Sequence, residues 1–300
     1  MEDKKLPNDY QTSKKYQNLY MIVLILPVIL YIVFLCKAIL LISKKKTIII
    51  CEEDYELING TCDRRYYSFE ALYKTTSKRE GIIFFGYNFD FDADYIKEMR
   101  INSTKIEVAD SYIFKNTGVH TLKVLFDIIP TNLEYMFKGN KNLISIKFGE
   151  LFNTQNVTSM YSMFRDCSNL TSIDLSNFNT PNVASMDGMF YDCSSLVSID
   201  VSNFNTQKVT SMSEMFSGCS NLTSIDVSNF NTQNIKYINE MFYRCYSLRS
   251  IVFFEIDFTP YFYTHIFTNV GSNGIIKIYR DLPSSLENKI PSSWEIIYID

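Results

Sequence analysis

One sequence unit is written four times in the middle of the chain, and it limits the folds that the chain can adopt. The pattern Met-Phe-x-x-Cys recurs every 26 residues, at Met163–Cys167, Met189–Cys193, Met215–Cys219 and Met241–Cys245. Weaker copies extend the array upstream, so the predicted repeat region covers residues 106–259. A fixed period of this length is typical of a solenoid, in which each repeat packs only against its neighbours.

The spacing of apolar residues in each unit predicts a short helix followed by a short strand. Met160, Met163, Phe164 and Cys167 stand at positions i, i+3, i+4 and i+7, the spacing of one helical face. Further on, Ile173-Asp174-Leu175 alternates apolar and polar residues, as a half-buried strand does. We therefore expect an α/β repeat in which every rung has a helical arm, a turn, a strand and a return loop.

The two ends of such an array need caps, because terminal repeats would otherwise expose the core. Aromatic-rich, strand-like sequence at 67–105, above all IIFFGYNFDF (82–91), is the predicted N-terminal cap. Residues 260–300, which contain GIIKIY (274–279) and WEIIYI (294–299), are the predicted C-terminal cap.

The unit Met-x-x-Met-Phe-x-x-Cys-Ser-x-Leu-x-Ser-Ile-Asp-[Leu/Val]-Ser-Asn-Phe-Asn-Thr resembles the repeats of BspA-type leucine-rich-repeat surface proteins, over about residues 117–258. The resemblance implies a leucine-rich-repeat-like solenoid with a parallel β-sheet face. It also implies a non-catalytic role in adhesion or protein binding. The fourth copy departs from the pattern, since Val252 replaces the Asp and Phe253-Phe254-Glu255 replaces the next run. We interpret this departure as the end of the array.

A long apolar stretch near the N-terminus predicts a membrane span. Residues 19–36 are uninterrupted LYMIVLILPVILYIVFLC, and AILLI continues the run to residue 42 after Lys37. This run is long enough to cross a bilayer. It is too long for a signal-peptide core, and no small-residue cleavage site follows. We expect one transmembrane signal-anchor helix over 19–42, after a polar tail (1–18) and before a juxtamembrane stalk (43–66). A buried helix of a soluble protein is the alternative.

The side of the membrane is harder to predict, because lysines lie on both sides of the run. Five Asn-x-Ser/Thr sequons favour an extracellular or luminal repeat domain, although two of them follow from the repeat itself. These candidate glycosylation sites are Asn59, Asn102, Asn156, Asn169 and Asn221. Cys51 and Cys62 form a possible disulfide if they lie outside the cytosol, and free thiols if they lie inside.

A column of acidic residues is the candidate binding face. Asp174, Asp200 and Asp226 take the outward strand position of three successive rungs. Stacked strands lie about 4.8 Å apart, so the carboxylates would align and repel one another. They could receive a cation or a basic partner surface, or they could be a solvated ladder that keeps the face soluble. Serines flank them on the same face: Ser172, Ser176, Ser198, Ser202, Ser224 and Ser228.

The sequence lacks the residue patterns that metal binding, catalysis or nucleic-acid binding would require. Cysteines 26 residues apart on successive rungs form a line and cannot converge on zinc, so we expect them in the core. The chain has two histidines, His120 and His265, and no nucleotide-binding or hydrolase motif. A net charge of −4 gives no general attraction to nucleic acid. We expect a non-enzyme without cofactor or metal that sits in a membrane and binds a protein, cell-surface or matrix ligand. A structural scaffold or spacer is the alternative.

Overall fold

The chain forms two compact units, Met1–Tyr66 and Tyr67–Asp300. The computed structural model describes residues 39–42, 47–50, 55–58, 61–64, 66–86, 88–89, 92–253, 263–279 and 284–299. In the first unit, β1 (Ile39–Ile42) pairs antiparallel with β2 (Thr47–Ile50), and β3 (Tyr55–Ile58) pairs antiparallel with β4 (Thr61–Arg64).

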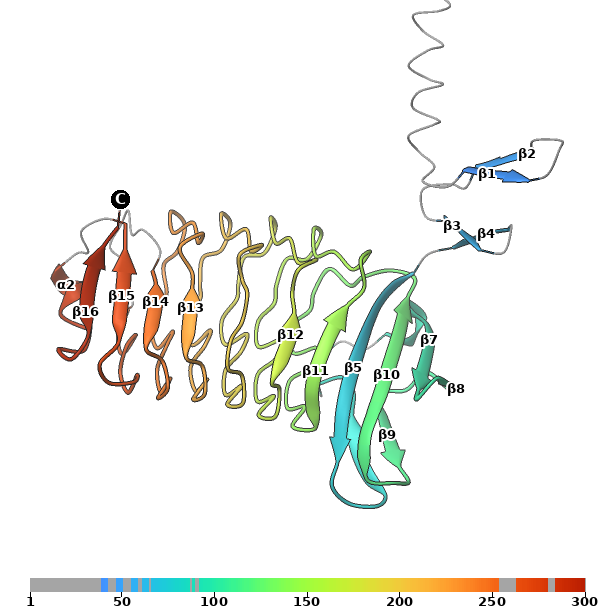
Figure 1. Ribbon diagram of the computed structural model, residues 1–300, viewed down its shortest axis with the longest axis horizontal. Helices are drawn as coiled ribbons and strands as arrows, with labels where there is room; N and C mark the ends of the chain where they lie inside the picture. Colours follow the sequence, from blue (N-terminus) through green and yellow to red (C-terminus); the bar gives the residue numbers. More distant parts are fainter. Residues whose placement is uncertain are drawn as a thin grey trace, which may run out of the picture. The chain divides into compact units, whose positions relative to one another are not determined.

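Strands line one side of the second unit (Figure 1). A six-stranded mixed sheet has the order β12-β11-β5-β10-β7-β8. Its strands are β5 (Tyr67–Thr75), β7 (Ile96–Ile101), β8 (Thr104–Ile106), β10 (Gly118–Phe126), β11 (Leu143–Phe148) and β12 (Ser172–Asp174).

A four-stranded parallel sheet closes the C-terminal part of the unit. It contains β13 (Ser224–Asp226), β14 (Ser250–Val252), β15 (Ile275–Ile278) and β16 (Glu295–Tyr298). The remaining elements of the unit are the pair β6 (Glu80–Ile83) and β9 (Ser111–Phe114), the 3-10 turn η1 (Ala93–Tyr95) and the helix α2 (Ser284–Glu287).

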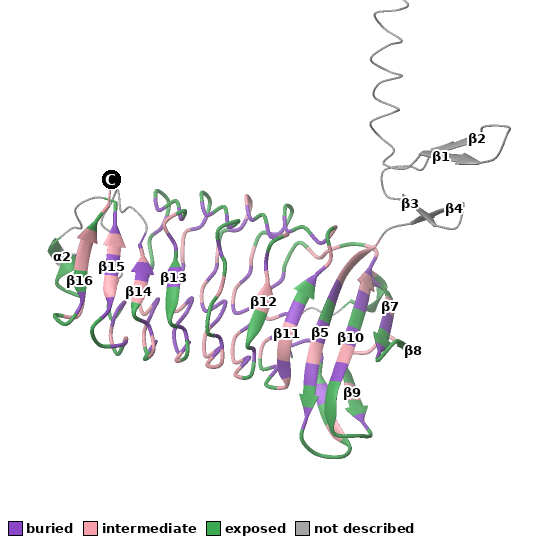
Figure 2. Ribbon diagram, in the orientation of Figure 1, coloured by how far each residue is buried: buried purple, intermediate pink, exposed green. Residues whose placement is uncertain are grey.

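The repeats stack one on another as rungs. Parallel bridges join Asn132 to Ser159, Ser159 to Ser185, Ser185 to Ser211 and Ser211 to Tyr237. The buried rings of Phe164, Phe190, Phe216 and Phe242 stack with centroids 5.6–5.8 Å apart and planes within 4° of parallel. Columns of Met, Phe, Cys and Leu thus form one continuous core. Figure 2 shows buried segments recurring from rung to rung.

The predicted helical arm is wrong, and with it the α/β fold class. In the described part of the chain the only α-helix is the four-residue α2, and the second unit is nearly all β-strand and turn. Residues 160–167 make two consecutive turns, because Ser162 (φ 52°) and Asp166 (φ 62°) are left-handed. A right-handed helix cannot continue through such residues. Equivalent residues are left-handed in every later repeat, at Gly188, Asp192, Glu214, Gly218, Glu240 and Arg244.

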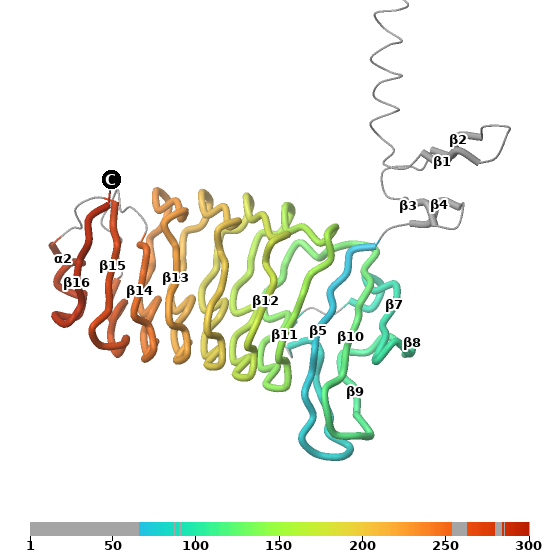
Figure 3. Tube along the Cα trace, viewed as in Figure 1, coloured from blue at the N-terminus to red at the C-terminus, as the bar shows by residue number. Residues whose placement is uncertain are grey.

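Hydrogen bonds between rungs explain why turns replace the helix. The N–H of Cys167 donates to the Phe164 carbonyl three residues earlier (3.2 Å), which closes a turn within the rung. The N–H of Phe164 instead donates to the Met189 carbonyl of the next rung (2.8 Å). This alternation recurs along the array. The tube in Figure 3 shows the successive rungs that these bonds join. In a helix, all of these N–H groups would donate to carbonyls of the same rung. The same apolar spacing therefore serves stacked turns as well as a helix.

The structure does not support the predicted single-pass membrane helix. Residues 39–42, the end of the predicted span, form strand β1, and the rest of 19–42 lies outside the described residues. No helix in the described ranges is both long and apolar enough to cross a bilayer. Isoleucines dominate β1 and β2, and such β-branched residues favour strands. The predicted single-pass span and membrane localisation are therefore not supported by the described residues.

Both ends of the stack continue its columns. Near the N-terminal end, the Phe85 ring stacks on Phe137 at 6.4 Å, and the Gly86 N–H donates to the Met136 carbonyl (2.9 Å). Near the other end, Phe267 stacks on Phe242 at 6.0 Å. Segments outside the four clear repeats therefore extend the aromatic ladder.

Candidate binding face

The three aspartates of the predicted column lie on one face, although only two of them lie in strands. Asp174 ends β12 and stands in parallel register with Lys147 of β11. Asp226 ends β13, beside Val252 of β14. Asp200 lies between them in a rung without an assigned strand. Asp200 and Asp226 line one shallow depression of 560 Å³, so the column does continue from rung to rung.

Each aspartate has a structural partner within its own rung. One carboxylate oxygen, Oδ1, accepts a backbone hydrogen bond from the serine two residues later, at 2.9–3.1 Å. The pairs are Asp174–Ser176, Asp200–Ser202 and Asp226–Ser228. These bonds close a turn at the end of each strand position. The sequence pattern suggested a binding role or a solubility role for these residues, and their turn-forming role is visible only in the structure.

Hydrogen bonding also favours the charged form of two of these carboxylates, Asp174 and Asp200. The hydrogen bonds from Ser176 lower the pKa of Asp174, and the nearby Lys147 ammonium lowers it further. The hydrogen bonds from Ser202 lower the pKa of Asp200 in the same way. The fold itself therefore favours the negative charge at Asp174 and Asp200, without any ligand.

Strand pairing extends the column into a longer line of charges. Lys147 faces Glu70 across β11 and β5, and Glu70 faces Lys123 across β5 and β10. Lys123 faces Arg100 across β10 and β7, and Arg100 faces Lys105 across β7 and β8. We call the whole set the charge row: Lys105, Arg100, Lys123, Glu70, Lys147, Asp174, Asp200 and Asp226.

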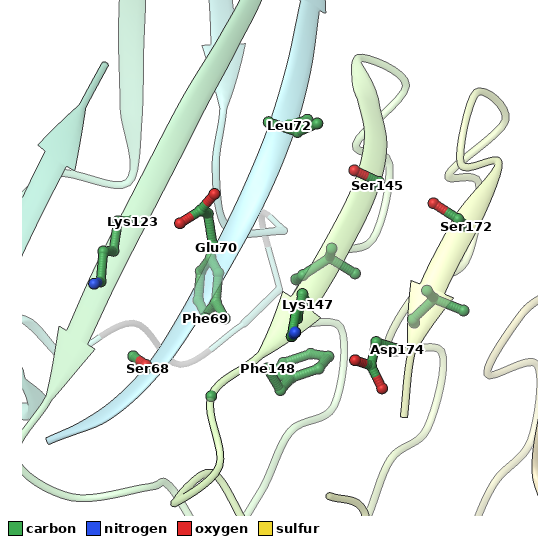
Figure 4. A pocket seen from close by; sticks show the side chains of 13 residues that line it. Ser68, Phe69, Glu70, Leu72, Lys123, Ser145, Lys147, Phe148, Ser172 and Asp174 are labelled. Atoms are coloured by element: carbon green, nitrogen blue, oxygen red, sulfur yellow. The ribbon is translucent and has the colours of Figure 1, made fainter. Parts of the chain in front are cut away.

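The middle of the charge row forms a second depression of 540 Å³. Figure 4 shows Lys123, Glu70, Lys147 and Asp174 side by side on four neighbouring strands. The repeat pattern did not identify Lys123 and Glu70 as part of this face. Their alternation with buried residues marks them as outward-facing, yet only the placement of β5 between β10 and β11 makes them neighbours.

The flanking serines are exposed except Ser228, which is half-buried. Asn102, Asn156, Asn169 and Asn221 are exposed, while Asn59 and Cys51 lie outside the described residues. The amide of Asn102 is already engaged, since its Nδ2 lies 3.2 Å from His120 Nδ1 and its Oδ1 accepts from the Thr121 N–H at 2.9 Å. The Asn169 amide donates to the Lys141 carbonyl (2.7 Å). Glycosylation and the Cys51–Cys62 disulfide stay predictions.

A clamp across three rungs lies on the turn side of the array. The Arg165 guanidinium lies 3.7 Å over the Tyr191 ring, and its Nη1 is 3.3 Å from Glu214 Oε2. Nearby, the Asp187 carboxylate accepts hydrogen bonds from Ser211 Oγ and from the Ser213 N–H. Burial raises the pKa of Asp187. These contacts join successive rungs, so we assign them to stability.

The repeat cysteines form a buried column of free thiols. Each thiol donates to the carbonyl of a phenylalanine in the preceding rung, as Cys193 does to Phe164 at 3.1 Å. Burial raises the pKa of all four thiols well above the ordinary value. Within the described residues, no group of three His, Cys, Asp or Glu side chains is placed to hold a metal ion.

These features define a stacked-repeat protein with a charged strand face. Residues 129–199 and 194–257 match the family described as "Mycoplasma protein of unknown function, DUF285". The matched residues cover the clear repeats and less than half of the chain. This match supports a surface repeat family for the array, but not the finer BspA-type leucine-rich-repeat assignment. No curated protein and no solved structure matches the chain.

Proposed function

We propose that this protein is a non-catalytic surface repeat protein of the BspA-like kind. It binds another protein, or a cell-surface or matrix ligand, through the strand face of its second unit. The observation that supports this proposal is the charge row. Eight charged side chains occupy one line across seven strands and the rung of Asp200, where a partner can meet all of them at once. Charged faces of this kind steer association and select partners.

The rigid base of the face also favours recognition. The strands beneath the charge row rest on fully buried side chains such as Phe69, Val124 and Ile146. The acidic rungs are fixed in addition by their own Asp–Ser turns. A face that is ordered before binding loses little conformational entropy on binding. A spacer would need only the buried columns and would not require a patterned surface.

The aspartates can be neutralised without losing their turns, which gives a direct test. In the triple variant Asp174→Asn, Asp200→Asn and Asp226→Asn, the amide oxygen still accepts the serine N–H. We expect binding of the purified full chain to cultured epithelial cells, measured by flow cytometry, to fall at least fivefold. A matched control removes three acidic charges elsewhere, through Asp94→Asn, Glu134→Gln and Glu287→Gln.

Equal binding by the triple variant and the wild type would contradict the proposal, and so would an equal loss in the control. If the wild type does not bind cells and purifies from its source in a stoichiometric complex, the scaffold role replaces the proposed one.

A further inference from the structure

We propose that the partner of the strand face is a second copy of this chain. The two copies form a symmetric dimer whose two-fold axis runs parallel to the strands, between β5 and β11. This inference rests on the proposed function, because it names the partner of the same face.

The order of signs along the charge row carries the inference. From β8 toward β13 the row reads plus, plus, plus, minus, plus, minus, minus, minus. Reading the row backwards and inverting every sign gives the same series. A second copy turned about the midpoint therefore places an opposite charge against each of these eight charges. The pairs are Lys105–Asp226, Arg100–Asp200, Lys123–Asp174 and Glu70–Lys147.

Symmetry makes each of these pairs occur twice, because a two-fold interface uses the same patch on both subunits. An axis parallel to the strands lays one row on the other in reverse order. An axis along the row would instead lay each charge on its own copy, and like charges at contact distance repel. The sign order thus selects one of the two face-to-face arrangements.

The face is large enough for a stable pair. Eight positions about 4.8 Å apart span roughly 34 Å. With about three outward side chains on each strand position, the interface would bury on the order of 1,100 Å² in total. A specific interface needs about 1,000 Å² or more.

The row next to the charges permits close approach. Ser145 stands in register with Ser172 of β12, and exposed Ser198 and Ser224 continue this row on the following rungs. Leu72 stands beside Ser145 in β5 and is half-buried. At the two-fold axis, Leu72 of each copy would lie against Ser145 of the other copy. Small side chains and one apolar contact at the centre let the longer charged side chains reach across.

The central charges are available for such pairing. In the part of the chain that the structure describes, Lys123, Glu70 and Lys147 make no ion pair. Arg100 and Lys105 are different, since both contact Glu98, at 3.2 Å for Lys105. Glu98 offsets part of the positive charge at that end. We therefore expect the two central pairs, Lys123–Asp174 and Glu70–Lys147, each present twice, to decide the dimer.

Charge exchange within one chain tests the arrangement. We expect the purified full chain at about 50 μM to sediment as a dimer in 50 mM NaCl and to dissociate in 500 mM NaCl, because exposed charges are screened by salt. Lys123→Asp and Asp174→Lys should each weaken dimerisation at least tenfold, and the double variant should return to within threefold of the wild type. Glu70→Lys and Lys147→Glu form a second exchange, at two positions whose side chains make no hydrogen bond to the described residues.

Circular dichroism and melting temperature check that each variant is folded. Lys236→Glu is the matched control, since this exposed lysine precedes Tyr237 of the inter-rung bridge to Ser211 and is not part of the charge row. We expect it to leave the dimer unchanged.

A wild type that is monomeric at 50 mM NaCl overturns the inference, as does a dimer that neither exchange affects. These results are distinct from a failure of the proposed function. If the wild type is monomeric and the Asp-to-Asn triple variant still loses cell binding, the dimer is refuted and the proposed function stands. If the protein forms a charge-dependent dimer but binds no cells, the proposed adhesion is refuted and the dimer stands.

Discussion

Left-handed residues are the smallest feature on which this fold depends. Two of them in each repeat, such as Ser162 and Asp166, turn the chain so that Met160, Met163 and Phe164 all point inward. Most of these positions hold residues other than glycine. For such residues the left-handed conformation costs about 1–2 kcal/mol each. Stacking must offset that cost, because every turn is hydrogen-bonded to the next rung.

Gly86 is the single residue whose replacement we expect to be most damaging. A Cβ atom at this position would lie 2.1 Å from the Tyr135 carbonyl oxygen, a backbone atom that cannot swing aside. Gly86→Ala should therefore separate the segment around Phe85 from the turn at Tyr135 and Met136. We expect the free energy of unfolding in urea to fall by about 2–4 kcal/mol. Gly81→Ala is the control, since its Cβ would meet only a side-chain atom at 4.0 Å. A similar loss in both variants would refute the clash as the cause.

At the scale of elements, the sequence predicted the period, the buried columns and the outward aspartates. It failed where two backbone conformations share one apolar spacing. Met160–Cys167 fits a helical face, and nothing in that spacing shows that the N–H groups bond to another rung. It failed again for β5, whose neighbours in the sheet are β10 and β11, far from it in sequence. Glu70 could thus be predicted as exposed, but not as a member of the charge row.

The loop between β5 and β6 makes an element-scale prediction about pH. Backbone hydrogen bonds from Ser77 and Thr76, with one from the Asn142 side chain, lower the pKa of Glu80 from about 4.5 to about 2. A carboxyl whose pKa is lower in the folded state stabilises the fold above its unfolded pKa. That contribution is lost as the pH falls from about 4.5 to about 2.

Glu80→Gln should therefore lower stability at pH 7 and flatten the pH dependence of the melting temperature between pH 4.5 and pH 2. The comparison uses thermal melts of wild type and variant at matched ionic strength. If the two curves stay parallel through this range, Glu80 does not contribute as proposed. Glu107→Gln, at an exposed glutamate outside this loop, serves as the control.

At the scale of the whole molecule, the second unit is a sum of nearly identical junctions. The junctions between Phe164, Phe190, Phe216 and Phe242 have almost the same ring spacing, 5.6–5.8 Å. Nearest-neighbour stacking of this kind makes stability depend on the number of rungs more than on any one of them.

Removal of one whole unit should for that reason leave a folded protein. Deleting residues 183–208 takes out 26 residues and joins Asn182 to Val209, which continues the repeat in phase. We expect a cooperative urea transition with a free energy of unfolding lower by about 2 kcal/mol or more, since one junction is lost. Deleting 183–195 removes half a unit and places polar residues in the core columns. This control should not fold cooperatively, and a folded half-unit deletion would contradict the stacking account.

The sameness of the junctions also has a genetic consequence. A recombination or replication slip that adds or drops 26 codons keeps the reading frame and meets an equivalent junction on both sides. Such a slip would lengthen or shorten the array between two unchanged ends in a single step. Related genes in a population should accordingly differ by whole repeats more often than by partial ones, so that the reach of the array becomes an inherited and rapidly variable trait.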